Sequence, residues 1–243
     1  MTHTNVGPLR LAVGSHKAGS GRGCAMNVIS WENGDSRISD MPDCTHPFLS
    51  RVVQLLNDSI CAHRDGDLLC ADCSVIVLGL AHRTVGTADA DPDGRVMVRI
   101  AAEEAQRVAH LNSDPRVQAA IDAAQAAIDA ALAWADTPTA AAAYAANAAA
   151  GRVVAYAATR ATHAAAYAAY AAAGRVEQTA DAYAARATYA TYAADAAADA
   201  AAGRVEQTER IIDRFRALTG HDTTAPDPTV TAQAITRMLQ VTA

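Results

Sequence analysis

The chain has 243 residues and a formal net charge of −6, which is enough length to bury a core of its own. Lys and Arg form no clusters, which argues against a nucleic-acid partner, and no run of about 18 strongly apolar residues predicts a membrane span. Residues 1–15 lack the regions of a signal peptide, so we expect a cytoplasmic protein with reduced cysteines.

The first part of the chain predicts short elements separated by polar turns. Residues 8–13 favour a short strand or an extended arm, followed by a Gly/Ser loop over 14–23. Apolar periodicity, cap residues and the Asn33-Gly34 turn then predict helices over 24–31, 47–61, 68–83 and 95–110. For the second of these, Thr45 or His46 is the expected cap, with Pro47 in the first turn.

The second part of the chain is dominated by alanine, the strongest helix former. From Ala140 to Ala202, 35 of the 63 residues are Ala. After a helix over 114–135, we expect long helices that pack closely, in a bundle or a rod, so the predicted fold class is all-α. We expect a helical domain over 1–113, an alanine-rich region over 114–220, and a linker with a short helix over 221–243.

A repeat runs through the alanine-rich part. The sequence AAAGRV occurs at 148–153, 171–176 and 200–205, so each copy places a glycine after a run of alanine. Glycine often follows the last residue of a helix, which favours a hairpin at each copy. It also permits close crossing of another helix, which favours continuous helices. Both interpretations remain open from the sequence.

One predicted helix of this part carries a stripe of larger residues. Spacings of three and four place them on one side of the helix. The stripe predicts either a core of aromatic side chains or an interaction surface, and it consists of Tyr156, Thr159, His163, Tyr167 and Tyr170.

The candidate sites for chemistry have incomplete signatures. The Gly14–Gly23 loop has Ser20 where a phosphate-binding loop needs lysine, so it does not predict a nucleotide site. No nucleophile motif predicts an enzyme, and we expect no cofactor. The candidate metal ligands of the N-terminal segment are His16, Cys24, Cys44 and His46.

The cysteines allow three arrangements. Cys44-x-His46 and Cys70-x-x-Cys73 are two close pairs of the kind that bind zinc. A disulfide between Cys24 and Cys44 is the second possibility. The third, which we favour, is that Cys70 and Cys73 are buried thiols on one face of the helix over 68–83 and bind no metal.

The N-terminal segment resembles one found in uncharacterised proteins of actinobacteria and their phages. The similar motifs are GSH at 14–16, GCAMN at 23–27 and SDMPDC at 39–44, with Asn27 and Met41 replacing the acidic residue and the histidine of that pattern. The alanine-rich part is similar to proteins labelled as immunity proteins. The resemblance implies an accessory protein of a phage or mobile element.

We therefore predict a non-enzymatic interaction protein. Its expected partner is a host protein or a toxin, and its alanine-rich helices favour a homo-oligomer, because Ala buries little apolar area within one chain. A structural protein of a virion is the first alternative. A small metal-stabilised enzyme built on the N-terminal cysteines is the second.

Overall fold

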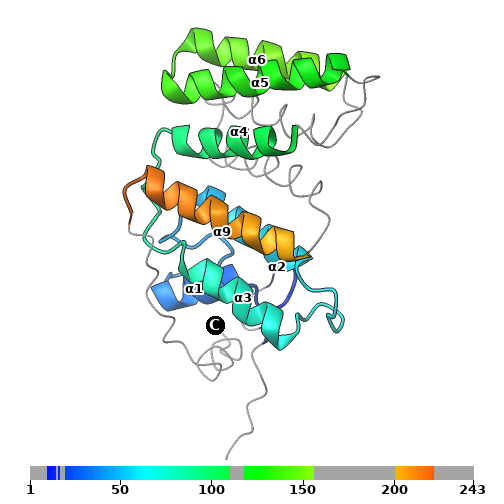
Figure 1. Cartoon of the computed structure of the whole chain (residues 1–243). Coiled ribbons are helices and arrows are strands. Elements are labelled where there is room, and N and C mark those ends of the chain that lie inside the picture. Colours follow the sequence, from blue (N-terminus) through cyan, green and yellow to red (C-terminus); the bar gives the residue numbers. More distant parts are fainter. Residues whose placement is uncertain (1–9, 15, 17–19, 110–117, 156–200, 222–243) are drawn as a thin grey trace, which may run out of the picture. The chain divides into compact units, whose positions relative to one another are not determined.

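The computed structural model describes residues 10–14, 16, 20–109, 118–155 and 201–221 (Figure 1). These residues contain isolated β-bridges but no strand, so the predicted all-α class is confirmed. No helix among them is long and apolar enough to cross a membrane. The helices are α1 (Ala25–Asn33), α2 (Pro47–Ser59), α3 (Ala71–His82), α4 (Arg95–Ala109), α5 (Gln118–Asp136), α6 (Ala140–Ala155) and α9 (Ala201–Leu218).

The chain divides into two compact units that are discontinuous in sequence. The first comprises Met1–Asp89, Arg204–Ile212 and His221–Ala243, and the second comprises Ala90–Gly203 and Asp213–Gly220. Helix α4 therefore belongs with α5 and α6. The boundary expected at residue 113 and the short helix expected within 221–243 lie outside the described residues and stay predictions.

An extended N-terminal arm organises the first unit. The Leu69 N–H donates to the Leu11 carbonyl at 2.8 Å, and the Val13 N–H donates to the Asp67 carbonyl at 2.8 Å. Leu11 and Ala12 are fully buried. The arm therefore pairs locally with the segment that precedes α3, and the expectation of an extended arm is confirmed for the described residues 10–13.

The side chain of Asn57 on α2 joins the arm to α1. Its amide nitrogen donates to the Ala12 carbonyl at 2.8 Å, and its amide oxygen accepts from the Ala25 N–H at 3.3 Å. Asn57 is buried, so these bonds satisfy backbone groups that water does not reach.

Helices α1 and α2 begin and end close to the positions that the sequence predicts. Gly34 ends α1 with a φ of 76°, in the left-handed region that glycine tolerates best. His46 is the residue that caps α2, because its Nδ1 accepts from the Phe48 N–H at 3.3 Å. Phe48, Leu49 and Val53 then pack fully buried in the core of this unit.

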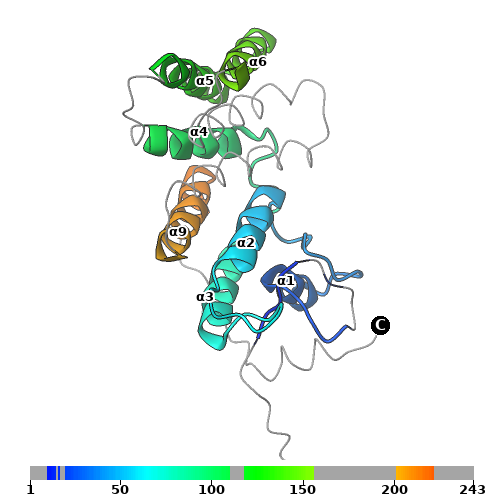
Figure 2. The ribbon, with the colours of Figure 1, turned by 90° about the vertical axis from the view of Figure 1, so that its right-hand side faces the viewer.

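Helix α3 begins later than the sequence predicts. Asp67 lies in a tight turn that is closed by backbone bonds between Asp65 and Leu68, and Cys70 is the N-cap residue. Cys70 and Cys73 are half-buried rather than buried, so the expectation of two buried thiols inside a longer helix is wrong. They lie in the cap and the first turn of α3, which Figure 2 shows beside α1 and α2.

Alanine supplies most of the core between α5 and α6 in the second unit. Thr139 precedes α6 and caps it, since its Oγ1 accepts from the Ala142 N–H at 3.1 Å. Small side chains allow the two helices to approach closely, as the sequence predicts. The buried alanines of this pair are Ala124, Ala127, Ala131, Ala135, Ala143, Ala146 and Ala149.

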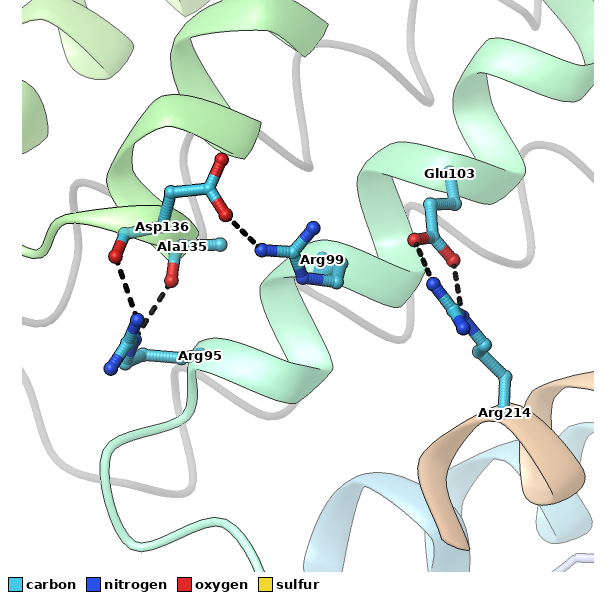
Figure 3. Close-up of polar contacts among 6 residues, drawn as sticks. All are labelled: Arg95, Arg99, Glu103, Ala135, Asp136 and Arg214. Carbon is cyan, nitrogen blue, oxygen red and sulfur yellow. Dashed lines mark hydrogen bonds and ion pairs between the residues drawn. The ribbon is translucent and has the colours of Figure 1, made fainter. Parts of the chain in front are cut away.

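Arginine side chains join α4 to α5 and to the C-terminal part of α9 (Figure 3). Arg95 donates to the carbonyls of Ala135 and Asp136, each at 2.7 Å, and so satisfies the C-terminal end of α5. Arg214 forms a two-bond pair with Glu103, at 2.8 and 2.9 Å. The forked geometry fixes the direction of approach as well as the charge pairing.

The helix continues through the glycine in two copies of the repeat. Gly151 lies within α6 and Gly203 lies within α9. At these two positions the structure supports continuous helices rather than hairpin turns. Gly174 and the stripe from Tyr156 to Tyr170 lie outside the described residues.

The contacts of Asn57 generate a stability prediction. Asn57→Ala leaves the Ala12 carbonyl and the Ala25 N–H without their partner, and an unpaired buried polar group costs roughly 1–3 kcal/mol. We expect the free energy of unfolding to fall by about 2 kcal/mol or more in urea titrations followed by circular dichroism. Asp58→Ala removes the bonds that its carboxylate accepts from the Gly14 N–H and the Asn57 amide, but at an exposed position that water can reach, so it should cost less than half as much. Equal losses would contradict this assignment.

Candidate metal centre

Three cysteines from two neighbouring segments meet at the start of α3. Cys61 follows the end of α2, Cys70 is the N-cap of α3, and Cys73 lies in its first turn. Their sulfur atoms all lie within 4.8 Å of one another. Cys61 is 8% exposed and the other two are half-buried, so the cluster lies close to the surface.

Backbone groups around the cluster fix its geometry. The Cys70 N–H donates to the Cys61 Sγ at 3.4 Å. The Leu11 N–H donates to the Ser74 Oγ at 3.0 Å, and that hydroxyl donates to the Cys70 carbonyl at 2.9 Å. The arm therefore positions the first turn of α3, on which two of the three thiols lie.

Two further contacts hold the chain segments next to Cys70 and Cys61. Arg10 Nε donates to the Leu69 carbonyl at 3.0 Å, next to Cys70. Arg204 of α9 donates to the Ser59 carbonyl at 3.0 Å, two residues before Cys61. The three cysteines thus come from segments that the fold anchors independently.

The electrostatics of the three thiols differ. Burial acts to raise the pKa of Cys61, but hydrogen bonds from the backbone and thiol of Cys70, from the His63 N–H and from the Cys73 thiol outweigh it and lower that pKa. Burial, followed by the neighbouring Cys70 and Cys61 thiols, raises the pKa of Cys73 to about 12. One negative charge is stabilised among the sulfurs, and further thiolates repel one another.

The cluster has the dimensions of a thiolate metal site. Zinc binds cysteine sulfur at about 2.3 Å, which places the sulfurs of a tetrahedral site about 3.8 Å apart. Separations within 4.8 Å need to contract by only about 1 Å. A soft donor set of three cysteines suits zinc better than the hard cations magnesium and calcium.

The structure does not gather the four ligands that the sequence suggested. Among the described residues, the grouped candidate ligands are the three cysteines alone. His46 caps α2, while Cys24 is buried at the N-cap of α1, where burial raises its pKa to about 11. Cys24 and Cys44 are free thiols rather than a disulfide.

Cys61 is the residue that sequence reasoning missed. The sequence predicts Cys70 and Cys73 inside a longer helix over 68–83, which gives no reason to expect a partner in the preceding loop. The available signal was the Cys61-x-His63 pair, which stands a short turn before Cys70. Two close pairs of ligands separated by a short loop are typical of structural zinc sites.

His16 lies in a separate polar cavity of about 360 Å³. Its Nε2 atom is buried and has no hydrogen-bond partner. The remaining lining includes Arg37, Asp40 and Asp43, so groups of both charges face the same space. This mixture does not favour any one class of ligand.

His82, which pairs with a carboxylate, has a structural role. His82 Nδ1 donates to the Leu78 carbonyl at 2.9 Å, and its Nε2 contacts the Glu32 carboxylate at 2.8 Å. Nδ1 therefore binds within α3, and Nε2 joins α3 to α1, so both ring nitrogens are engaged. Burial acts to lower the pKa of His82, but the hydrogen bond and charge of Glu32 and the bond to Leu78 outweigh it and raise that pKa.

Comparisons with known proteins add no relative. The chain matches no protein family in a comparison with family models, and neither the curated proteins nor the solved structures contain a match. The resemblance of the N-terminal segment to actinobacterial and phage proteins stays a prediction.

The Glu32–His82 pair predicts a pH dependence of stability. The folded pKa of His82 is raised above its ordinary value of 6.5, so the pair stabilises the fold fully below that pH and less as the pH rises through the raised pKa. We expect the free energy of unfolding of the unmodified chain, relative to Glu32→Gln, to decrease as the pH rises above 6.5 through the raised pKa of His82. Parallel profiles for the two proteins would contradict the assignment.

Proposed function

We propose that the chain is a non-enzymatic protein-binding protein whose first unit is stabilised by one zinc ion at Cys61, Cys70 and Cys73. The observation that supports the metal site is that the three sulfur atoms lie within 4.8 Å of one another. Like-charged thiolates repel at this distance, and a divalent cation replaces that repulsion by three bonds.

The surroundings of the cluster favour a structural role for the metal. The cysteines join the end of α2 to the start of α3, where a bound ion cross-links two segments that the short loop 62–69 connects. Metal binding at such a position contributes directly to folding stability. The His82–Glu32 pair uses both imidazole nitrogens within the fold, which favours no catalytic function for it.

An exposed apolar surface on α3 supports the binding role. Val75 is 63% exposed and Ile76 is 42% exposed, directly after the cysteines of the first turn. Apolar side chains at neighbouring positions on a surface favour association with another protein. The resemblance to phage proteins supports the narrower proposal that the partner is a host protein or a toxin.

The proposed metal site is tested by measuring the zinc content of the purified protein. We expect the full chain, purified under reducing conditions, to contain close to one zinc ion per chain by mass spectrometry of metals. The double variant Cys70→Ser, Cys73→Ser should lose that zinc, because it removes two of the three sulfur ligands.

Cys44→Ser is the matched control, since Cys44 is a free, half-buried thiol outside the cluster. It should retain the zinc. A chain that contains no zinc and takes up none when zinc is added, with its helical spectrum intact, would refute the metal centre. Loss of zinc from the control alone would also refute it.

The binding role is tested by capture from the native host. A tagged full chain should retain a defined protein that the variant with Val75→Asp and Ile76→Asp loses, because the carboxylates disrupt apolar contact. Tyr144→Asp is the control, since Tyr144 is 76% exposed on α6. Equal capture by all three proteins would contradict a role for this surface, and recovery in phage particles would support the virion alternative instead.

A further inference from the structure

One side of helix α3 faces away from the core of the first unit. Val75 and Ile76 are exposed there and Gly79 is half-buried, whereas Ser74, Val77 and Leu78 on the other sides of the helix are buried. The outward residues follow the spacing of a single helix face. This set, termed the α3 face, consists of Asp72, Val75, Ile76, Gly79 and Arg83.

Gly79 is the small residue near the centre of the α3 face. Glycine weakens a helix relative to alanine. The backbone of Gly79 is helical and lacks the positive φ that favours glycine. Within the described part of the chain, nothing lies within 4 Å of the Cβ that another residue would place there. The fold of one chain therefore does not require glycine at this position, whereas a second helix that crosses the face closely does.

The charges and the shape of the α3 face agree on one register for an antiparallel pair of α3 helices. In a pair with two-fold symmetry, residues that meet across the axis have residue numbers with a constant sum. The numbers of Asp72 and Arg83 have the same sum as those of Ile76 and Gly79. One alignment therefore places Asp72 opposite Arg83 of the second copy and also places Ile76 opposite Gly79 of the second copy.

We propose that α3 pairs antiparallel with α3 of a second copy of the chain. Ile76 fills the space over Gly79 of the second copy, and Asp72 forms an ion pair with Arg83 of the second copy. Each contact occurs twice, because the interface is two-fold symmetric. Val75 adds apolar area beside Ile76.

This inference rests on the proposed binding role of the exposed surface on α3 and names a second copy of the chain as its partner. The dimer is then the form that captures a host protein or a toxin. The variant with Val75→Asp and Ile76→Asp loses such a protein because it loses the dimer.

A parallel pair of α3 helices is disfavoured by the same residues. It places Asp72 against Asp72 and Arg83 against Arg83, so that like charges repel at both ends. It also places Gly79 against Gly79, which leaves a gap where the antiparallel pair has the Ile76 side chain.

Gly79→Leu distinguishes a role in the dimer from a role in the fold. Leucine is a better helix former than glycine and meets open space within one chain, so the variant should keep its helical circular dichroism spectrum. In the dimer, the leucine occupies the place of Ile76 from the second copy. Ultracentrifugation of the full chain, reduced and at micromolar concentrations, should show a reversible dimer whose dissociation constant Gly79→Leu raises by roughly tenfold or more.

Reversal of the two charges gives an independent test. Asp72→Arg and Arg83→Asp should each weaken the dimer, because like charges then meet at both ends of the helix pair. A mixture of the two variants should restore it, since every contact then joins opposite charges. Tyr144→Asp, at an exposed position on α6, is the control and should dimerise like the unmodified chain.

A chain that stays monomeric at these concentrations overturns the dimer. A dimer that persists unchanged in Gly79→Leu and in both charge variants forms elsewhere, as the alanine-rich helices would favour, and also overturns it. If the chain is monomeric but the variant with Val75→Asp and Ile76→Asp still loses a captured protein, the proposed binding role stands without the dimer. If the dimer forms as expected and no other protein is captured, the inference stands and the proposed capture of a host protein or toxin fails.

Discussion

The first unit depends on the hydrogen bonds of its N-terminal arm. Leu11 alone accepts from the Leu69 N–H and donates to the Ser74 hydroxyl, so one buried residue sets both the extended segment before α3 and the first turn of that helix. Asn57 extends the same connection to α1 and α2. Each of these bonds satisfies backbone groups in the core, where an unpaired group is costly. The positions of Cys70 and Cys73 follow from this arm rather than from the local sequence.

The proposed zinc centre uses a geometry that the protein already holds. Because the arm, Arg10 and Arg204 anchor the flanking segments, the three thiols are brought together before any ion binds. Little conformational entropy then remains to be lost on binding, which favours high affinity. The arrangement also explains why a near-surface site of three cysteines is compatible with the fold, since the ion compensates the repulsion between the thiolates.

The sequence predicts those features that local chemistry determines. Caps, turns and helix propensity predict the ends of α1 and α2 and the alanine packing of α5 and α6, because these depend on residues a few positions apart. The start of α3 depends instead on distant residues. The sequence predicts a helix from residue 68, yet Asp67 pairs with Arg22, its carbonyl accepts from the Val13 N–H, and the backbone there forms a turn between Asp65 and Leu68. Cys61 escaped prediction for the same reason, since its neighbours are set by the arm.

The division of α9 between the two units limits how the chain can be divided into separately expressed fragments. Arg204–Ile212 belongs to the first unit and Asp213–Gly220 to the second, so neither unit is encoded by one uninterrupted stretch. A fragment that stops before residue 204 lacks the Arg204 bond at the end of α2 and the Arg214 fork on α4 at once. Expression of either half alone therefore removes native contacts from it, and a fragment that keeps both of these bonds has to include α9.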